Sequence, residues 1–175
     1  MKKIIVTGGS GFIGSNLVNY LIKKNFFVIN LDKLTYSANN YNEKKQNKKN
    51  YKLIKIDINN KKKLIGIIKR YKPEAIFNLA AETHVDRSID GPKSFIHTNI
   101  NGTFNILESL RHLRKKKIIP KLIHISTDEV YGDIKIGRSD ENHKYEPSSP
   151  YSASKASADH LVKSYIRTFK LNAVI

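Results

Sequence analysis

The chain has 175 residues, which is enough for one domain with its own hydrophobic core. It contains no cysteine, so disulfides and thiolate metal sites are excluded, and we expect no bound metal. We find no signal-peptide pattern and no apolar run of the roughly 20 residues that cross a membrane, so we expect a cytoplasmic protein without a membrane partner. The net charge is +17, but 26 of the 32 basic residues are lysine. Because nucleic-acid readers rely on arginine, we expect no specific nucleic-acid partner.

Short apolar runs alternate along the chain with longer segments of helical period. The runs are apolar throughout, as expected for parallel strands covered on both faces. The strand candidates are residues 4–7, 27–31, 53–56, 75–79, 122–126 and 173–175. Helix candidates follow at 13–22 and 64–68, and after Pro92 and Pro150. The polar segment 39–52 is interpreted as a solvated loop. This order predicts an α/β protein with a doubly wound parallel sheet, a Rossmann-type fold.

A glycine-rich turn lies between the first strand candidate and the first helix candidate. It spans Thr7-Gly-Gly-Ser-Gly-Phe-Ile-Gly14, where Gly8, Gly11 and Gly14 have the spacing of a dinucleotide-binding turn. Glycines there permit a tight turn and a close approach of pyrophosphate to the backbone. The helix N-terminus offers N–H groups and a positive dipole end to the phosphates. We therefore expect a nucleotide cofactor at this turn.

Acidic residues end the next two strand candidates. Asp32 can accept hydrogen bonds from the adenosine ribose, and its carboxylate would repel a 2′-phosphate, which favours NAD over NADP. Lys33 could instead pair with that phosphate. Asp57 follows the third strand, where adenine lies in such folds, and its alternative role is a helix N-cap. Small residues in Leu79-Ala-Ala81 would let the dinucleotide pass close to the backbone.

Tyr151 and Lys155 have the i, i+4 spacing that puts two side chains on one helical face. A lysine ammonium one turn away favours tyrosinate and would make Tyr151 a usable general base. The spacing alone does not discriminate, because it recurs at four other tyrosines: Tyr20, Tyr41, Tyr51 and Tyr131. Only Tyr151 lies on a helix that can face the carboxyl ends of the strands, where ligands bind in such sheets.

Thr127, Asp128 and Glu129 leave the fifth strand candidate at that same edge. Neighbouring carboxyl groups can have their pKa values pushed apart, which gives one acid and one base. Alone, Asp128 and Glu129 would be interpreted as a solvated turn. At a strand tip beside the Tyr151–Lys155 pair, we interpret them as catalytic.

Four longer strings stand out. They are Leu31-Asp-Lys-Leu-Thr-Tyr36, Ala81-Glu-Thr-His-Val-Asp-Arg-Ser88, Ser126-Thr-Asp-Glu-Val-Tyr-Gly132 and Ser149-Pro-Tyr-Ser-Ala-Ser-Lys-Ala156. Together they resemble the extended short-chain dehydrogenase/reductases and, among these, the dTDP-glucose 4,6-dehydratases. The resemblance runs from Lys3 to Ile175. It implies that residues 1–175 form an NAD-binding Rossmann domain with the catalytic motifs, truncated before a C-terminal substrate-binding domain.

The resemblance also implies a reaction. Tyr151, helped by Lys155 and Thr127, would take the proton of the glucose 4-hydroxyl while a hydride passes to NAD. Glu129 would remove the C5 proton, and Asp128 would protonate the departing 6-hydroxyl. The hydride then returns to C6, so the product is dTDP-4-keto-6-deoxyglucose, a precursor of deoxysugars such as rhamnose. The long helices after the two prolines pack between subunits in this family, which implies a homodimer.

The binding residues implied by the resemblance fall into two groups. Thr83, Val85 and Thr127 would lie near the sugar. The cofactor residues would be Gly8, Gly11, Phe12, Ile13, Gly14, Asp32, Lys33, Leu34, Thr35, Asp57, Ile58, Leu79, Ala80, Ala81, Thr98, Tyr151 and Lys155.

Two alternatives stay open. One keeps the fold and changes the chemistry to that of a UDP-hexose 4-epimerase or decarboxylase, and Asp128 and Glu129 speak against it. The other is an inactive truncated remnant that at most binds NAD. Because the last strand candidate reaches the end of the chain, we expect no turnover from residues 1–175 alone.

Overall fold

The computed structural model describes residues 1–38, 49–134 and 136–175. Within these residues, one parallel sheet has the strand order β3-β2-β1-β4-β5-β6. The strands are β1 (Lys3–Thr7), β2 (Phe27–Asp32), β3 (Tyr51–Lys55), β4 (Ala75–Asn78), β5 (Lys121–His124) and β6 (Ala173–Val174). The chain crosses from one half of the sheet to the other between β3 and β4, so β1 and β4 lie side by side at its centre. This order is that of the doubly wound dinucleotide-binding sheets, which confirms the predicted fold.

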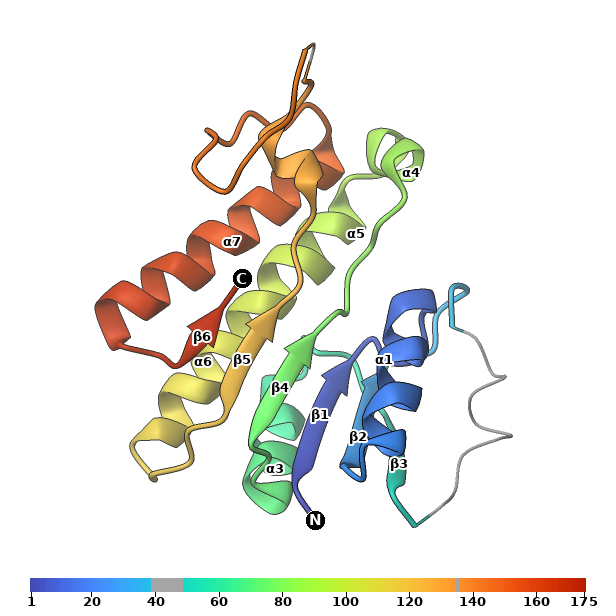
Figure 1. The fold of residues 1–175 in the computed structure, drawn as a ribbon, viewed down its shortest axis with the longest axis vertical. Helices are drawn as coiled ribbons and strands as arrows, with labels where there is room; N and C mark the ends of the chain where they lie inside the picture. Colours follow the sequence, from blue (N-terminus) through green and yellow to red (C-terminus); the bar gives the residue numbers. More distant parts are fainter. Residues whose placement is uncertain (39–48, 135) are drawn as a thin grey trace.

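Helices cover both faces of the sheet (Figure 1). On one face, α1 (Phe12–Lys23) packs on β1 and β2. On the other face lie α3 (Lys61–Tyr71), α6 (Gly102–Arg114) and α7 (Pro150–Phe169). Shorter elements are α4 (Val85–Asp90), α5 (Lys93–Phe95), a π-helix at Ile96–Asn101 and a 3₁₀-helix at Asp128–Tyr131. No helix of the described residues is long and apolar enough to cross a membrane.

The alternation of side chains along β1 explains the two-sided core. Ile5 faces the α3–α6–α7 side and joins Leu107 and Leu122 in the larger apolar cluster. Ile4 and Val6 face α1 and join the smaller cluster. All five of these side chains are buried, as expected for a central parallel strand. The continuous apolar run therefore predicts a strand with helices on both sides, and the structure has that arrangement.

Several predicted boundaries are wrong. The sequence predicts a polar loop at 39–52, but Tyr51 and Lys52 already pair with β2, and residues 39–48 lie outside the described part of the chain. The helix expected at 64–68 extends over Lys61–Tyr71, because Asn60 caps it by accepting a hydrogen bond from the Lys63 N–H. The segment after Pro92 is not one regular helix, since a π-helical stretch interrupts it. The short α4 was not predicted at all.

The N-terminus of α7 is fixed by a capping box. The Ser149 hydroxyl accepts a hydrogen bond from the Ser152 N–H at 3.0 Å, and the Ser152 hydroxyl accepts one from the Ser149 N–H at 3.0 Å. Pro150 occupies the first helical position, where its missing N–H costs nothing. This cap sets where α7 starts, and therefore where Tyr151 lies.

Replacing Ser149 with alanine removes the cap, and we expect a loss of about 1 kcal/mol in the free energy of unfolding. Urea denaturation measures it. The matched control is Ser164→Ala, on the exposed surface of the same helix, which should change the stability by less than about 0.5 kcal/mol. Equal effects of the two substitutions would contradict a capping role for Ser149.

Candidate active site

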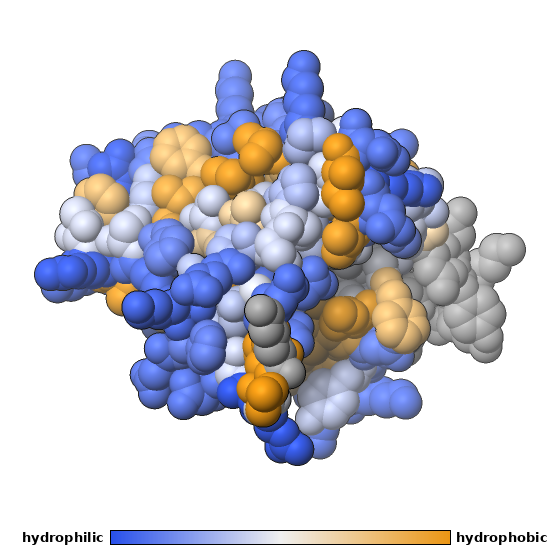
Figure 2. Space-filling model, turned by 90° about the horizontal axis from the view of Figure 1, so that it is seen from above, coloured by the Kyte–Doolittle hydropathy of each residue, from blue (hydrophilic) through white to orange (hydrophobic). Residues whose placement is uncertain are grey.

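An open cavity of about 480 Å³ lies at the carboxyl edge of the sheet. It is bounded by the glycine turn after β1, the ends of β2 and β4, the π-helix and the start of α7. Figure 2 looks down on this edge, where orange apolar residues are interspersed among blue polar ones. The cavity lies next to the central strands β1 and β4, where the strand order reverses and ligands bind in open α/β sheets.

The glycine turn is built for a close approach of backbone segments. Gly8 has φ +68°, and a Cβ there would lie 2.8 Å from backbone atoms of Ala80. A Cβ on Gly14 would lie 2.1 Å from the Gly8 carbonyl oxygen. Helix α1 starts directly after Gly11, with no side-chain cap and no acidic residue in its first turn. The helix therefore keeps its positive end available for an anion.

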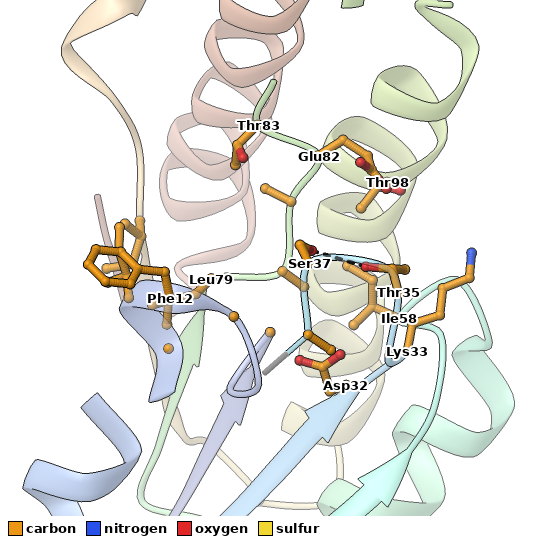
Figure 3. A pocket seen from close by; sticks show the side chains of 18 of the residues that line it. Phe12, Asp32, Lys33, Thr35, Ser37, Ile58, Leu79, Glu82, Thr83 and Thr98 are labelled. Carbon is orange, nitrogen blue, oxygen red and sulfur yellow. Dashed lines mark hydrogen bonds between the residues drawn. The ribbon is translucent and has the colours of Figure 1, made fainter. Parts of the chain in front are cut away.

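Asp32, at the end of β2, has its carboxylate fixed by two backbone donors. Oδ2 accepts from the Ser10 N–H at 2.9 Å, and Oδ1 accepts from the Leu34 N–H at 2.7 Å. The carboxylate thereby joins the glycine turn to the segment after β2. It lies on the floor of the cavity in Figure 3. Each oxygen has lone pairs left for further donors, such as sugar hydroxyls.

Lys33 does not extend toward Asp32. Its side chain extends away from the Asp32 carboxylate in Figure 3, and its Nζ lies 2.8 Å from Asp57 Oδ2. Burial alone would raise the pKa of the Asp57 carboxyl, but the Lys33 ammonium and hydrogen bonds from Asn59 outweigh burial and lower it. The helix N-cap at α3 is Asn60, so the alternative role of Asp57 as that N-cap is wrong.

The buried side-chain amide of Asn99 fixes the segment after β4 in an extended conformation. Asn99, in the π-helix, accepts from the Glu82 N–H and donates to the Glu82 carbonyl, both at 2.9 Å. These two hydrogen bonds resemble those between paired strands, and they keep Leu79–Glu82 extended along the cavity. Thr98 precedes Asn99 and lines the cavity. π-helical turns often occur at functional sites, because the extra residue changes which side chains face the ligand.

The tip of β5 carries the predicted hydroxyl and carboxyl groups. Thr127 caps the 3₁₀-helix, since its Oγ1 accepts from the Glu129 N–H at 3.3 Å. The same hydroxyl lies 3.3 Å from Asp128 Oδ1. Burial and the negative charge of Asp128 raise the pKa of the Glu129 carboxyl. A raised pKa brings a carboxylate closer to the range of a useful general base.

Tyr151 is buried in the first turn of α7, where its ring packs edge-on against Phe95 and its N–H donates to the Ser88 hydroxyl. Burial raises the pKa of the Tyr151 phenol, and the negative charges of Asp128 and Glu129 add to this. A hydrogen bond with Thr127 acts in the opposite direction. The phenol therefore faces the Thr127 tip, although the two residues are 24 positions apart in the sequence.

Lys155 lies one turn further along α7 and is 5% exposed. Its Nζ donates to the Ile125 carbonyl at 2.5 Å rather than to the Tyr151 phenol. Burial lowers the pKa of the Lys155 ammonium to about 8. The expected lowering of the Tyr151 pKa by this ammonium is therefore not the dominant effect in the structure, where burial prevails.

The cavity collects most of the predicted binding residues. Of the predicted cofactor set, Leu34 alone is missing from the lining that the described residues form; its backbone N–H binds Asp32 instead. Thr83 lines the same cavity, whereas Val85 begins α4 and does not. Thr127 and Asp128 line a neighbouring open hollow of about 500 Å³. The two hollows share Ser126, so they meet at the tip of β5; Glu129 lines neither of them.

Sequence reasoning missed other lining residues. They are Leu31, Ser37, Ala38, Ile56, Glu82, His84, Ile125 and Ser126. Most adjoin a predicted residue, so extending each motif by one or two positions would have found them. Ala38 had no such signal, because its place depends on how the chain turns after β2. No cluster of three or more metal-ligating side chains occurs among the described residues.

The comparisons with known proteins identify the family of the chain. The sequence model of the GDP-mannose 4,6 dehydratase family matches residues 5–175. The chain belongs to this family. It is 46% identical, over its whole length, to the dTDP-glucose 4,6-dehydratase of Haemophilus influenzae, of which it covers 54%. The chain therefore spans about half the length of the curated relatives it matches.

Solved structures show the same fold. A dTDP-glucose 4,6-dehydratase from Streptomyces venezuelae, crystallised with NAD and the ligand TYD, aligns with a TM-score of 0.90 at 37% identity. That alignment covers 98% of this chain and 53% of the other. The UDP-glucose 4-epimerase of Thermotoga maritima, in complex with UDP-glucose, aligns with a TM-score of 0.86 at 32% identity. It covers 98% of this chain and 53% of the other. Fold similarity alone therefore does not separate dehydratase from epimerase chemistry.

Gly14→Ala tests the glycine turn. The added Cβ would overlap the Gly8 carbonyl oxygen, so we expect the affinity for NAD to fall at least about tenfold, measured by titration calorimetry. The control is Gly66→Ala in α3, where a Cβ meets nothing within 4 Å. That variant should bind NAD normally and be more stable by about 0.5–1 kcal/mol. Unchanged binding by Gly14→Ala would show that the dinucleotide lies elsewhere.

Proposed function

We propose that the cavity binds NAD. The residues fit this cofactor, because Gly8 and Gly14 leave a cradle that a Cβ would fill, and the uncapped N-terminus of α1 is suited to a pyrophosphate. The fixed Asp32 carboxylate is suited to the two ribose hydroxyls. The remaining predicted cofactor residues along the ends of β2 and β4 would line its path.

We further propose NAD rather than NADP. Asp32 presents a negative charge where the 2′-phosphate would lie, and the one cation beside it in the sequence, Lys33, is paired with Asp57. A phosphate would therefore meet a carboxylate without a free ammonium from Lys33. This pairing supports NAD as the cofactor, because it leaves the Lys33 ammonium engaged with Asp57.

We propose that the chain carries the NAD site and the proton-transfer groups of a dTDP-glucose 4,6-dehydratase. Such a lyase converts dTDP-glucose to dTDP-4-keto-6-deoxyglucose and water, a step toward deoxysugars such as rhamnose. The observation that carries this proposal is the junction of Thr127, Asp128 and Glu129 with Tyr151 at one strand tip. A simple dehydrogenase needs the phenol but has no use for two additional carboxyl groups.

Each group has a role in the proposed reaction. The tyrosinate form of Tyr151 takes the proton of the 4-hydroxyl, and the hydrogen bond with the Thr127 hydroxyl favours that tyrosinate because it lowers the pKa of the phenol. When bound, NAD accepts a hydride from C4 of the sugar and returns it to C6. Glu129 removes the proton from C5, which the 4-keto group acidifies. Asp128 donates a proton to the departing 6-hydroxyl, so that water leaves. Glu129 returns its proton to C5 as the hydride reaches C6, and the proton taken up by Tyr151 replaces the one lost by Asp128, so protons and charges balance.

We propose a homodimer for the complete protein. Ile96 and Phe104, on the π-helix and α6, are 46% and 42% exposed. Apolar side chains at such positions favour a helix-to-helix contact between copies.

We also propose that Thr83 and Val85 contact the sugar. The cytoplasmic location stays a prediction from the sequence.

Asp57→Asn tests the cofactor preference. The wild-type chain should bind NAD at least about tenfold more tightly than NADP. Removing the Asp57 charge frees the Lys33 ammonium, so NADP affinity should rise severalfold, as measured by calorimetry at low ionic strength. Asp90→Asn, an exposed change at the end of α4, should leave both affinities unaltered. Equal wild-type affinities for the two cofactors would contradict the proposal.

Glu129→Gln, in the protein expressed from its complete reading frame, tests the reaction. We expect elimination of water from dTDP-glucose to fall at least about a hundredfold, because the C5 base is lost, while oxidation at C4 persists. Solvent-deuterium exchange at C5 and absorbance of the reduced cofactor separate the two steps. An equal loss of both would assign Glu129 another role. Formation of the C4 epimer by the unmodified protein would favour the epimerase alternative.

A further inference from the structure

Two ionisable side chains lie buried behind the strand tip and have no role in the proposed reaction. His124 ends β5 and is 2% exposed, and Asp159 in α7 is 0% exposed. His124 Nε2 lies 3.4 Å from Asp159 Oδ1. Neither atom has a hydrogen-bonding partner within the described residues, so the two lie in contact as a pair of polar groups. Because burying a carboxylate costs free energy, packing alone does not account for this pair.

The pair terminates a line of hydrogen bonds that crosses the sheet. The Ala80 N–H donates to Thr7 Oγ1 at 3.2 Å, and the Thr7 hydroxyl donates to Asn78 Oδ1 at 2.7 Å. Asn78 Nδ2 then lies 3.0 Å from His124 Nδ1. The line thus runs from the cavity floor through β1, β4 and β5 to α7. All its donors point in one direction, toward Asp159.

This direction fixes the state of the imidazole. Since the Asn78 amide donates to Nδ1, that nitrogen accepts and the proton resides on Nε2, facing Asp159. Burial lowers the pKa of His124, and the Lys155 charge lowers it further, against the raising effect of Asp159. The histidine is therefore neutral, and Asp159 carries the negative charge of the pair.

Asp159 also binds the residue that precedes the catalytic tip. Its Oδ2 accepts from the Ser126 hydroxyl at 2.5 Å and from the Tyr145 hydroxyl at 3.1 Å. Lys155, one turn earlier on α7, donates to the Ile125 carbonyl. Three consecutive residues, 124 to 126, are thus held by two side chains of one helix. Thr127 follows immediately.

We propose that the buried Asp159–His124 pair is a positioning device, which holds the strand tip against α7 and keeps the Lys155 side chain charged in a buried place. Asp159 and Lys155 are four residues apart on one helix, so their side chains are neighbours. This role of the pair rests on the proposed function, in which a charged Lys155 and a fixed Thr127 both assist Tyr151. Neither Asp159 nor His124 is assigned contact with substrate.

The sign of the effect follows from the charges that face Lys155. Burial lowers the pKa of the Lys155 ammonium to about 8, and the Asp159 carboxylate opposes that decrease. The other ionisable groups around this place are His124, Asp128, Glu129, Tyr145, Tyr151 and Lys163. Removing the Asp159 charge should therefore move the titration of Lys155 to lower pH. Its charged form would then be lost closer to neutrality.

Asp159→Asn keeps the shape of the side chain and removes its charge. We expect the midpoint of Lys155 titration to fall below the wild-type value of about 8. Nuclear magnetic resonance of lysine labelled at Cε measures it, and the signal that disappears in Lys155→Met assigns the residue. Glu74→Gln is the control, since it removes an exposed carboxylate at the opposite edge of the sheet and should leave the midpoint unchanged. An unchanged midpoint in a folded Asp159→Asn protein would overturn the proposal.

A measurement on the unmodified protein covers the case in which Asp159→Asn does not fold. Nitrogen-15 resonances of the His124 imidazole should show the neutral form with its proton on Nε2 at pH 7. A protonated imidazolium, or a proton on Nδ1, would overturn the line of hydrogen bonds and the proposal with it.

Turnover supplies a separate readout in the protein expressed from its complete reading frame. In Asp159→Asn, the alkaline limb of the pH–rate profile should move to lower pH, whereas a merely structural defect would lower the rate at every pH alike. If the unmodified protein does not act on dTDP-glucose, the proposed function fails, but the two resonance measurements still decide whether Asp159 governs Lys155.

Discussion

The close approach of backbone segments around Gly8 is the constraint on which the site depends. Gly8 lies against Ala80, and Gly14 lies against Gly8, at distances that exclude any side chain. These contacts bring the ends of β1 and β4 and the start of α1 to one point. Asp32 fixes the same turn from the side of β2 through the Ser10 N–H. The cavity is what remains above this junction, so its floor consists of backbone and the Asp32 carboxylate, and its specificity comes from the few side chains around it.

The half of the sheet that contains β5 supplies ionisable side chains to the site. Helix α7 approaches the tip of β5 through Lys155 and Asp159, and the same helix carries Tyr151. Burial raises the pKa of the Tyr151 phenol and lowers that of the Lys155 ammonium. Both groups are therefore in their neutral forms more readily than in water, which is a consequence of low dielectric surroundings. The hydrogen bond with Thr127 and the charge of Asp159 act against burial at each of the two groups.

The sequence predicted what depends on local pattern. The glycine turn, the acid after β2 and the apolar strands are each determined within a few residues, and the structure has all of them. The π-helix was not predictable, because apolar spacing does not reveal one inserted residue before Gly102. The His124–Asp159 contact joins residues 35 positions apart and depends on how α7 lies on β5. Likewise, the sequence left Lys33 as an ambiguity, since only the folded chain brings Asp57 beside it.

The Lys33–Asp57 ion pair also bears on how cofactor preference could change in evolution. Replacing Asp32 by a neutral residue would remove the repulsion of a 2′-phosphate, yet Lys33 would stay bound to Asp57. Replacing Asp57 alone would free the lysine while Asp32 still opposed the phosphate. Each single replacement would therefore give only part of the gain in NADP affinity, and the full gain requires both positions to change. The ion pair thus turns a change of cofactor preference into a path of two steps.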